Sequence, residues 1–387
     1  MKIKTSTKLI ALLCLSAFLI CFAGTLFLQN KLTYVSAAGS SAKAMCVLDK
    51  DSHRILYSKN ENEQLPMAST TKVVTAITVI ENCKDLHEII TVNNNAVGVE
   101  GTSIYLRKTE QISVRDLLYG LMLRSGNDSA TALAYHVAGG VTEFAGLMND
   151  LANKVGAKNS HFANPHGLDN QNHYTTAYDL ALITCYALNN PIFKQIVSTK
   201  THVIPATNIS DKRYLTNKNR LLSSLDGCCG VKTGFTSKAG RCLVSACERE
   251  NQTTVCVVLN CGPMFEESAD LIESSFEDYN YTKLIDKNKQ IYNEYVTDTE
   301  NGRLYLYAKD DFYYPLKAGE EDNVKLAYNV KLDDAKQGSV VGNINIFLNN
   351  QLINSVKLYT INKIGKFLDN QTLQIKEILW EEKVNEN

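Results

Sequence analysis

Several features that would narrow the function are missing from this chain of 387 residues. Neither sign of charge is in excess, because 40 lysine and arginine residues balance 41 aspartate and glutamate residues. Nucleic-acid binding needs clustered basic residues, so nucleic acid is not an expected partner. No Cys-x-x-Cys pair and no His-Glu-x-x-His motif occurs, so we expect no metal and no cofactor. No internal repeat is visible.

The remaining composition is that of an ordinary globular protein, with 44% hydrophobic and 21% charged residues. The length is sufficient for two domains. Eleven cysteines are present, of which two fall in the apolar N-terminal run. Nine is an odd number, so at least one cysteine stays free or pairs between chains. Cys242, Cys247 and Cys256 lie in apolar, strand-like stretches, and we expect core packing for the cysteines as a group.

The N-terminus has the pattern of an export signal. Lys2, Lys4 and Lys8 precede an apolar run over residues 9–28, and small residues follow at 35–38. This pattern predicts a secretory signal that is cleaved after Ala37 or Ala38. The run is also as long as a membrane-spanning helix, so an uncleaved anchor over 1–38 is the alternative. Either way, we expect the rest of the chain to work outside the cytoplasm.

Helical and strand-like patterns alternate over residues 43–280. Apolar periodicity predicts a first helix from near 69 to 80 and a second that follows residues 113–116 and ends near 124. Further helices are predicted over 130–138, 142–154, 176–188 and 270–279. Residues 113–116 resemble a capping box at the start of the second helix. Strands are expected over 45–57, 230–234, 241–248 and 253–261.

The amino-acid composition changes after residue 281. Short alternating strands predict a small all-β domain over 281–360. Residues 361–387 are expected to form an amphipathic helix, whose apolar face comprises Ile364, Phe367, Leu368, Ile375, Ile378 and Leu379. Two alternatives are equally favoured: this helix lies on a membrane surface, or it docks on the β domain.

A first motif, Ser-Thr-Thr-Lys, spans residues 69–72. A serine hydroxyl is a poor nucleophile and needs a base within hydrogen-bond reach. Positions i and i+3 share a helix face, so Ser69 and Lys72 are expected to project together. Lys72 becomes a base if burial and a nearby cation lower its pKa. Free N–H groups at the helix start suit an oxyanion beside Ser69.

Two further motifs supply partners for this pair. In Ser-Gly-Asn at 125–127, Ser125 could relay a proton and Asn127 could donate to a substrate carbonyl, although the local pattern alone favours a capping turn with Ser125 or Asp128 as the N-cap. In Lys-Thr-Gly at 232–234, Lys232 supplies positive charge, Thr233 can bind a carboxylate and Gly234 permits close approach of a substrate backbone.

Each motif alone is weak evidence. Ser40 and Lys43 repeat the first spacing by chance, in a segment that no apolar helix follows. The three motifs in this order are specific, and they are the set found in penicillin-binding proteins and class A β-lactamases.

The chain resembles the low-molecular-weight penicillin-binding proteins, which are serine D-alanyl-D-alanine carboxypeptidases. The resemblance covers residues 43–280 and rests on the motif stretches at 65–72, 123–128, 164–168, 230–236 and 239–244. It extends more weakly over 281–360, where residues 336–342 match best.

The resemblance implies an α+β, β-lactamase/transpeptidase-like domain with a five-stranded antiparallel sheet, followed by a β-sandwich domain. It implies a Ser69 acyl-enzyme formed from a peptidoglycan pentapeptide, with release of the terminal D-alanine, and acylation by β-lactams. The backbone N–H groups of Ser69 and Phe235 would form the oxyanion hole. Association with the outer face of the cell membrane is a further expectation.

One departure from the family pattern concerns the substrate carboxylate. Many relatives carry an arginine shortly after the strand that follows the third motif, but residues 261–267 contain none. Carboxylate binding is then expected to depend on Lys232, Thr233 and Thr236. Two alternatives are ranked lower. A β-lactamase lacks support because residues 164–168 offer no Glu-x-x-x-Asn arrangement. A non-catalytic module that binds β-lactams or the cell wall, such as a sensor, would be expected to carry cytoplasmic signalling segments, and only a few residues precede the apolar run.

Overall fold

The computed structural model describes residues 35–36, 39–289, 292–295, 303–331, 336–360 and 372–379. The chain forms two compact units. One comprises Tyr34–Thr282 together with Tyr313–Ala318, and the other is built from Lys283–Phe312 and from Gly319 onward. A short segment of the later sequence therefore packs with the first unit.

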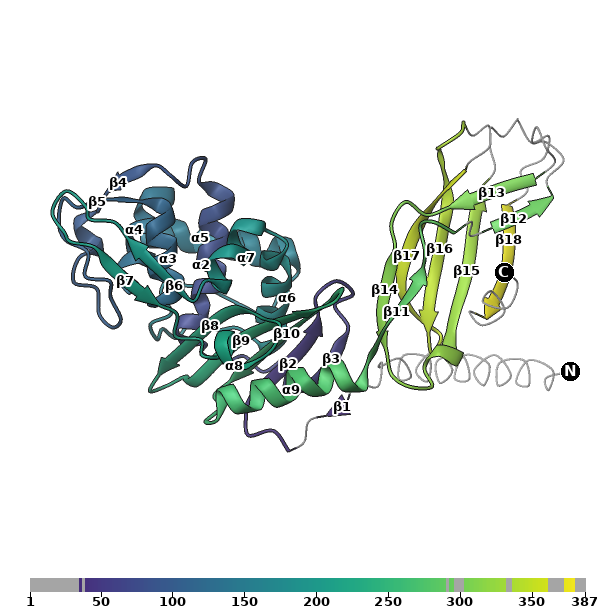
Figure 1. Ribbon diagram of the computed structural model, residues 1–387, viewed down its shortest axis with the longest axis horizontal. Helices are drawn as coiled ribbons and strands as arrows, with labels where there is room; N and C mark the ends of the chain where they lie inside the picture. Colours follow the sequence, from purple (N-terminus) through teal and green to yellow (C-terminus); the bar gives the residue numbers. More distant parts are fainter. Residues whose placement is uncertain are drawn as a thin grey trace, which may run out of the picture. The chain divides into compact units, whose positions relative to one another are not determined.

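The first unit is organised around a sheet with the strand order β1-β3-β2-β10-β9-β8 (Figure 1). Its strands are β1 (Val35–Ser36), β2 (Ala44–Asp49), β3 (Ile55–Lys59), β8 (Cys228–Thr236), β9 (Gly240–Arg249) and β10 (Gln252–Leu259). The last five pair antiparallel, while the two-residue β1 pairs parallel with β3. The predicted α+β fold with a five-stranded antiparallel sheet is confirmed.

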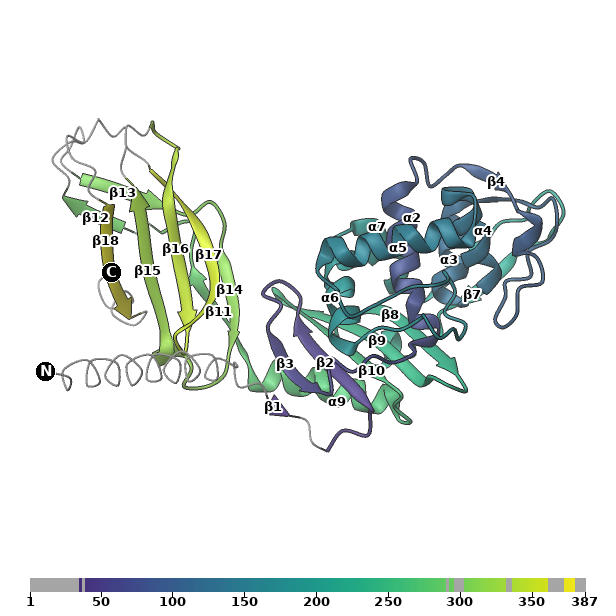
Figure 2. The same cartoon turned by 180° about the vertical axis from the view of Figure 1, so that it is seen from behind.

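Both faces of this sheet are covered, because side chains alternate along a strand. Ala44 and Cys46 of β2 pack into the core beneath the helical region, whereas Met45 and Val47 pack against α9. Figures 1 and 2 show α9 on one face of the sheet and α2, α6 and α7 on the other. A central strand buried on two sides explains why β2 is apolar at nearly every position.

The predicted helices of this unit are present in the expected order with shifted ends, together with α7 and α8, which the sequence pattern does not predict. They are α2 (Lys72–Asn82), α3 (Val114–Leu123), α4 (Asn127–Ala138), α5 (Val141–Val155), α6 (Ala177–Leu188), α7 (Pro191–Ser198), α8 (Leu221–Ser224) and α9 (Met264–Asp278). The smaller elements are η1 (Ala68–Thr71), β4 (Ile89–Thr91), η2 (Asn94–Ala96), β5 (Gln111–Ser113), β6 (Thr201–Ile204) and β7 (Arg213–Thr216).

Two helix starts show how the local sequence acts. The Ser113 hydroxyl accepts from the backbone N–H of Asp116 and so caps α3, as the capping-box pattern predicts. The helix α7 was missed, because Asn190-Pro191 resembles the end of α6. The Asn190 side chain instead caps α7, with Pro191 at its first position.

The second unit is built from strands. Its elements are β12 (Tyr292–Tyr295), β13 (Arg303–Tyr307), β15 (Val324–Lys331), β16 (Val340–Leu348), β17 (Gln351–Thr360), β18 (Thr372–Leu379) and the short η3 (Glu321–Asn323). These strands form one sheet in the order β12-β13-β17-β16-β15-β18. A separate pair joins β11 (Asn280–Ile285) and β14 (Phe312–Leu316). The β-rich C-terminal region is as predicted.

The amphipathic helix predicted over 361–387 is wrong where the structure describes it. Residues 372–379 form the strand β18, which pairs antiparallel with β15 and contains a register shift. Leu373 and Ile375 also fit a period of two, so eight residues do not separate the strand pattern from the helix pattern. Without β18, the outer edge of β15 would present unpaired backbone N–H and C=O groups, and pairing with β18 satisfies them. Residues 361–371 and 380–387 lie outside the described residues.

The cysteines behave as core residues. All nine in the described part of the chain are free thiols, and all but Cys83 and Cys228 are buried, which confirms the packing interpretation. No described helix is both long enough and apolar enough to span a membrane. Apart from β1, the predicted signal or anchor over 1–38 lies outside the described residues.

Candidate active site

A cleft of about 360 Å³ in the first unit brings the three sequence motifs together. Ser69 comes from η1, Ser125 from the α3–α4 turn, and Thr233, Gly234 and Phe235 from β8. Ser69 and Phe235 are 166 positions apart in the sequence, yet residues of all three motifs line one cavity.

Ser69 and Lys72 face each other at the start of α2. Ser69 lies in the 3-10 turn η1 and Lys72 is the first residue of α2, so the α-helix begins three residues later than expected. In a 3-10 turn, side chains three residues apart eclipse one another. Lys72 Nζ lies 2.9 Å from Ser69 Oγ, so the predicted pairing of the two side chains is confirmed.

The other two contacts of Lys72 orient its amine. Nζ donates to Asn127 Oδ1 at 2.7 Å and to the backbone oxygen of His166 at 2.5 Å. Both are pure acceptors, and a neutral amine has two N–H bonds and one lone pair. If Lys72 is neutral and directs its two N–H bonds at these oxygens, its lone pair faces the Ser69 hydroxyl.

The surroundings of Lys72 favour its neutral form. The side chain is completely buried. Burial lowers the pKa of Lys72 well below its usual value, and the charges of Lys232 and Lys218 lower it further, while Asp128 acts in the opposite direction. Burial also lowers the pKa of Lys232, to about 7, with a further contribution from Lys218. The site therefore contains an amine able to accept a proton.

Asn127 is occupied at both ends of its amide. Oδ1 accepts from Lys72 and Nδ2 donates to the backbone oxygen of Glu100 at 2.6 Å. In this geometry Asn127 positions Lys72, and one N–H of its NH2 group remains for a substrate carbonyl.

The second motif is not a side-chain cap. The N-cap of α4 is Gly126, and no side chain caps this helix. Asp128 instead accepts from the backbone N–H groups of Ile104 and Leu106. Ser125 has a left-handed backbone with φ of 65° and lines the cleft. Such strain in a non-glycine residue costs about 1–3 kcal/mol and clusters at functional sites.

The third motif forms the opposite wall of the cleft, as part of β8. Lys232 and Gly234 are buried on one face of the strand and Thr233 is half-buried on the other, as the alternation predicts. A Cβ on Gly234 would lie 3.0 Å from Ser69 N, Thr70 N and Met67 O. The glycine therefore lets β8 approach the backbone of the η1 turn that carries Ser69. Gly234, which directly precedes Phe235, therefore lies next to the backbone N–H of Ser69.

Two side chains that were expected to contact the substrate form hydrogen bonds to other groups of the protein. Lys232 does not appear among the described residues that line the cleft, and its Nζ donates to the Thr233 backbone oxygen at 2.7 Å. Thr236 donates to Asp169 Oδ1 at 3.0 Å and accepts from Ala239 N. Neither residue is among the described residues that line the cleft.

A histidine that the sequence pattern does not indicate contacts the η1 turn that carries Ser69. His173 Nδ1 accepts from Ala163 N, so the proton of the neutral ring is assigned to Nε2, which donates to Thr71 Oγ1 at 2.8 Å. Thr71 in turn donates to the backbone oxygen of Ala68. Burial lowers the pKa of His173 to about 4, which keeps the ring neutral. His173 lies 102 residues after Thr71, so no local spacing reveals this contact.

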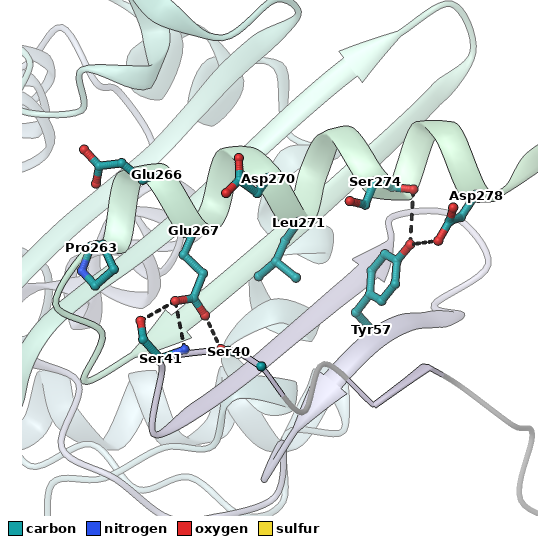
Figure 3. Close-up of a pocket in the computed structure, with 11 residues that line it drawn as sticks. Ser40, Ser41, Tyr57, Pro263, Glu266, Glu267, Asp270, Leu271, Ser274 and Asp278 are labelled. Carbon is teal, nitrogen blue, oxygen red and sulfur yellow. Dashed lines mark hydrogen bonds between the residues drawn. The ribbon is translucent and has the colours of Figure 1, made fainter.

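Ser40 and Ser41 of the chance motif line a different pocket, shown in Figure 3. Ser40 and Ser41 bond to the carboxylate of Glu267 on α9, while Lys43 pairs with Glu63. Tyr57 closes the far end of this pocket through Ser274 and Asp278. Ser40 has no amine at its hydroxyl, and the structure separates the two Ser-x-x-Lys matches clearly.

The fold and the cleft define a class of proteins: enzymes that acylate themselves on a serine activated by a lysine. Comparison with known families agrees. A profile described as D-alanyl-D-alanine carboxypeptidase matches residues 31–262, and the chain belongs to this family of serine-type carboxypeptidases. A second profile, described as the C-terminal domain of penicillin-binding protein 5, matches residues 279–366.

Individual relatives cover most of the chain. The D-alanyl-D-alanine carboxypeptidase DacF of Bacillus subtilis is 28% identical over 82% of this chain and 83% of its own length. DacC of Escherichia coli is 31% identical over 90% of each chain. Penicillin-binding protein 5 from Haemophilus influenzae is structurally similar, with a TM-score of 0.72 and 28% identity, over 86% of this chain and all of that structure.

Proposed function

We propose that this enzyme removes the terminal D-alanine from the pentapeptide stem of peptidoglycan through a Ser69 acyl-enzyme. One observation carries the proposal. Lys72 Nζ lies 2.9 Å from Ser69 Oγ, and its two remaining contacts are acceptors that leave its lone pair for the serine proton.

Acylation follows from this geometry. Lys72 takes the proton of Ser69 while Oγ bonds to the carbonyl carbon of the penultimate D-alanine. The backbone N–H groups of Ser69 and Phe235 stabilise the oxyanion. When the peptide C–N bond breaks, the proton passes from Lys72 to the leaving amine, with Ser125 as the relay. The products are free D-alanine and the Ser69 ester.

Deacylation repeats these steps with water. Lys72 accepts a proton from a water molecule, whose oxygen attacks the ester carbonyl. The Ser69 oxygen leaves and recovers the proton, and the shortened stem peptide departs. A β-lactam acylates Ser69 by the same first step, but its opened ring stays attached, so we expect a longer-lived adduct.

The remaining site residues act on the substrate or on the two amines. Thr233 binds polar groups of the terminal residue, and Gly234 keeps β8 against the η1 turn. Lys232 supplies charge that favours neutral Lys72, while Asn127 positions that amine. Thr236 supports the end of β8 through its bond to Asp169.

Export and membrane association rest on residues 1–38, a basic start followed by an apolar run. We propose that these residues carry the chain across the cell membrane, and that the enzyme acts at its outer face. Cleavage after Ala37 or Ala38 would remove β1. N-terminal sequencing of the protein recovered from membranes tests the proposal, and a mature start near Gly39 on a protein that stays in the membrane fraction would contradict anchoring by this segment.

The catalytic proposal is tested with Ser69→Ala. This variant should give no covalent labelling by fluorescent penicillin and release no D-alanine from a D-alanyl-D-alanine peptide. Ser40→Ala is the matched control, because it alters the chance motif, and it should label like the wild type. Labelling that survives in Ser69→Ala would exclude Ser69 as the nucleophile.

A further inference from the structure

Arg241 is a cleft residue to which no motif assigns a role. It lies at the start of β9, directly opposite Phe235 in the register of the sheet. Its side chain is exposed and lines the cleft together with Thr233. Its backbone oxygen accepts from Cys261 N at 2.8 Å, which ties this position to the segment before α9. Within the described ranges its guanidinium has no hydrogen-bond or ion-pair partner.

The other cations near the cleft are less suited to hold an anion. Lys232 is 1% exposed, and burial lowers its pKa to about 7, so much of it is neutral near that pH. Burial and the charge of Arg124 also lower the pKa of Lys218. The Arg220 guanidinium already pairs with Glu266 and stacks on Phe265. A guanidinium keeps its charge at every working pH, and its planar fork matches a carboxylate.

An enzyme that removes a C-terminal residue must distinguish the chain end from an internal peptide bond. The chain end differs by its free α-carboxylate. We propose that Arg241, with the Thr233 hydroxyl, binds this carboxylate, and this inference rests on the function proposed above. The segment at 261–267, which lacks an arginine, contributes Met264 and Phe265 to the same cleft as apolar side chains. The guanidinium would thus come from β9 in this chain.

The test compares two peptides that differ only at the end: one terminates in D-alanyl-D-alanine and the other in its C-terminal carboxamide. The wild type should cleave the free acid with the higher kcat/KM. Arg241→Gln should lower kcat/KM for the acid about 10- to 100-fold, the range expected for a charge-assisted contact, mainly through KM, and should cleave the carboxamide like the wild type. Arg241→Lys keeps the charge without the fork and should retain part of the preference.

Two other variants decide the assignment. Arg115→Gln removes an arginine of α3 that bonds to Gln195, and it should keep the full preference for the acid. Lys218→Gln should also keep it. Arg241→Gln with an unchanged acid-to-carboxamide ratio would overturn the inference, as would loss of the ratio in Lys218→Gln alone. Should Arg241→Gln not fold, Arg241→Met provides the same comparison. A wild type that cleaves neither peptide would instead refute the proposed function.

Discussion

The two units of this protein differ in what they bury. The first unit encloses charged and polar groups such as Lys72, Asp128 and Lys232, each with hydrogen-bond partners. Among the described side chains of the second unit, and leaving tyrosines aside, Thr360 is the one buried polar residue, and aliphatic residues such as Ile344 and Ile346 fill its interior. Burying an ionisable group costs stability unless it is paired, and clusters of such groups with perturbed pKa values are typical of functional sites. The comparison therefore locates the chemistry in the first unit.

The largest expected effect comes from removing the base. Lys72→Arg should reduce acylation by penicillin about 10²–10⁴-fold, because arginine does not release its proton at working pH. Stopped-flow measurement of the acylation rate provides the test. Lys154→Arg, an exposed exchange on α5, is the control and should change nothing. A Lys72→Arg enzyme with wild-type acylation would show that the buried amine is not the base.

The next effect concerns the close approach of β8 to the η1 turn that carries Ser69. Gly234→Ala introduces a Cβ 3.0 Å from three backbone atoms, so it should displace Ser69. We expect the acylation rate to fall about 10²-fold, because a small misplacement of reacting groups has an effect of this size. The free energy of unfolding should drop by about 1–3 kcal/mol because the added methyl group overpacks the site. Gly146→Ala is the control, because its Cβ would meet nothing within 4 Å on α5, and it should be neutral or stabilising. Equal effects of the two variants would contradict this account.

A smaller effect should appear in the pH dependence of the acylation rate. The positive charge of Lys218 lowers the pKa of both Lys72 and Lys232. Lys218→Gln removes that charge, so the pKa of Lys72 rises and more of it is protonated at a given pH. The acidic limb of the acylation rate should therefore move to higher pH. Lys84→Gln, an exposed exchange beyond the end of α2, should leave the profile in place. A shift in the opposite direction would rule out the Coulombic explanation.

The smallest catalytic effect is expected in the second unit. Ile344→Ala should lower the stability of that unit by about 2–5 kcal/mol and leave the acylation rate unchanged. Ile77→Ala on α2 removes the same side chain from the core behind the nucleophile and should affect both stability and rate. Thermal unfolding and labelling kinetics of the two variants measure the contrast. A slower Ile344→Ala enzyme would show that the β unit influences the cleft.

Local pattern was sufficient for much of the fold. Residue spacing and turn residues predict the helix after Ser69, the cap of α3 and the strands around residues 228–259. The structure contains all three. The pattern failed at α7 and at β18. Asn-Pro serves both as a stop and as a start, and eight residues with apolar positions at both periods fit a helix or a strand. In each case the choice depends on distant packing or pairing partners.

The same division holds for the site. The sequence by itself determined that Ser69 and Lys72 meet, because a separation of three residues on one turn places their side chains together. Only the tertiary structure decided where the lone pair of Lys72 points, since its acceptors lie 55 and 94 residues away on Asn127 and His166. It also decided that Lys232 is buried and that Arg241 lines the cleft. Burial and long-range hydrogen bonds determine the protonation of the lysines and which side chains reach the cleft. Both depend on residues far apart in the sequence, so no local spacing predicts them.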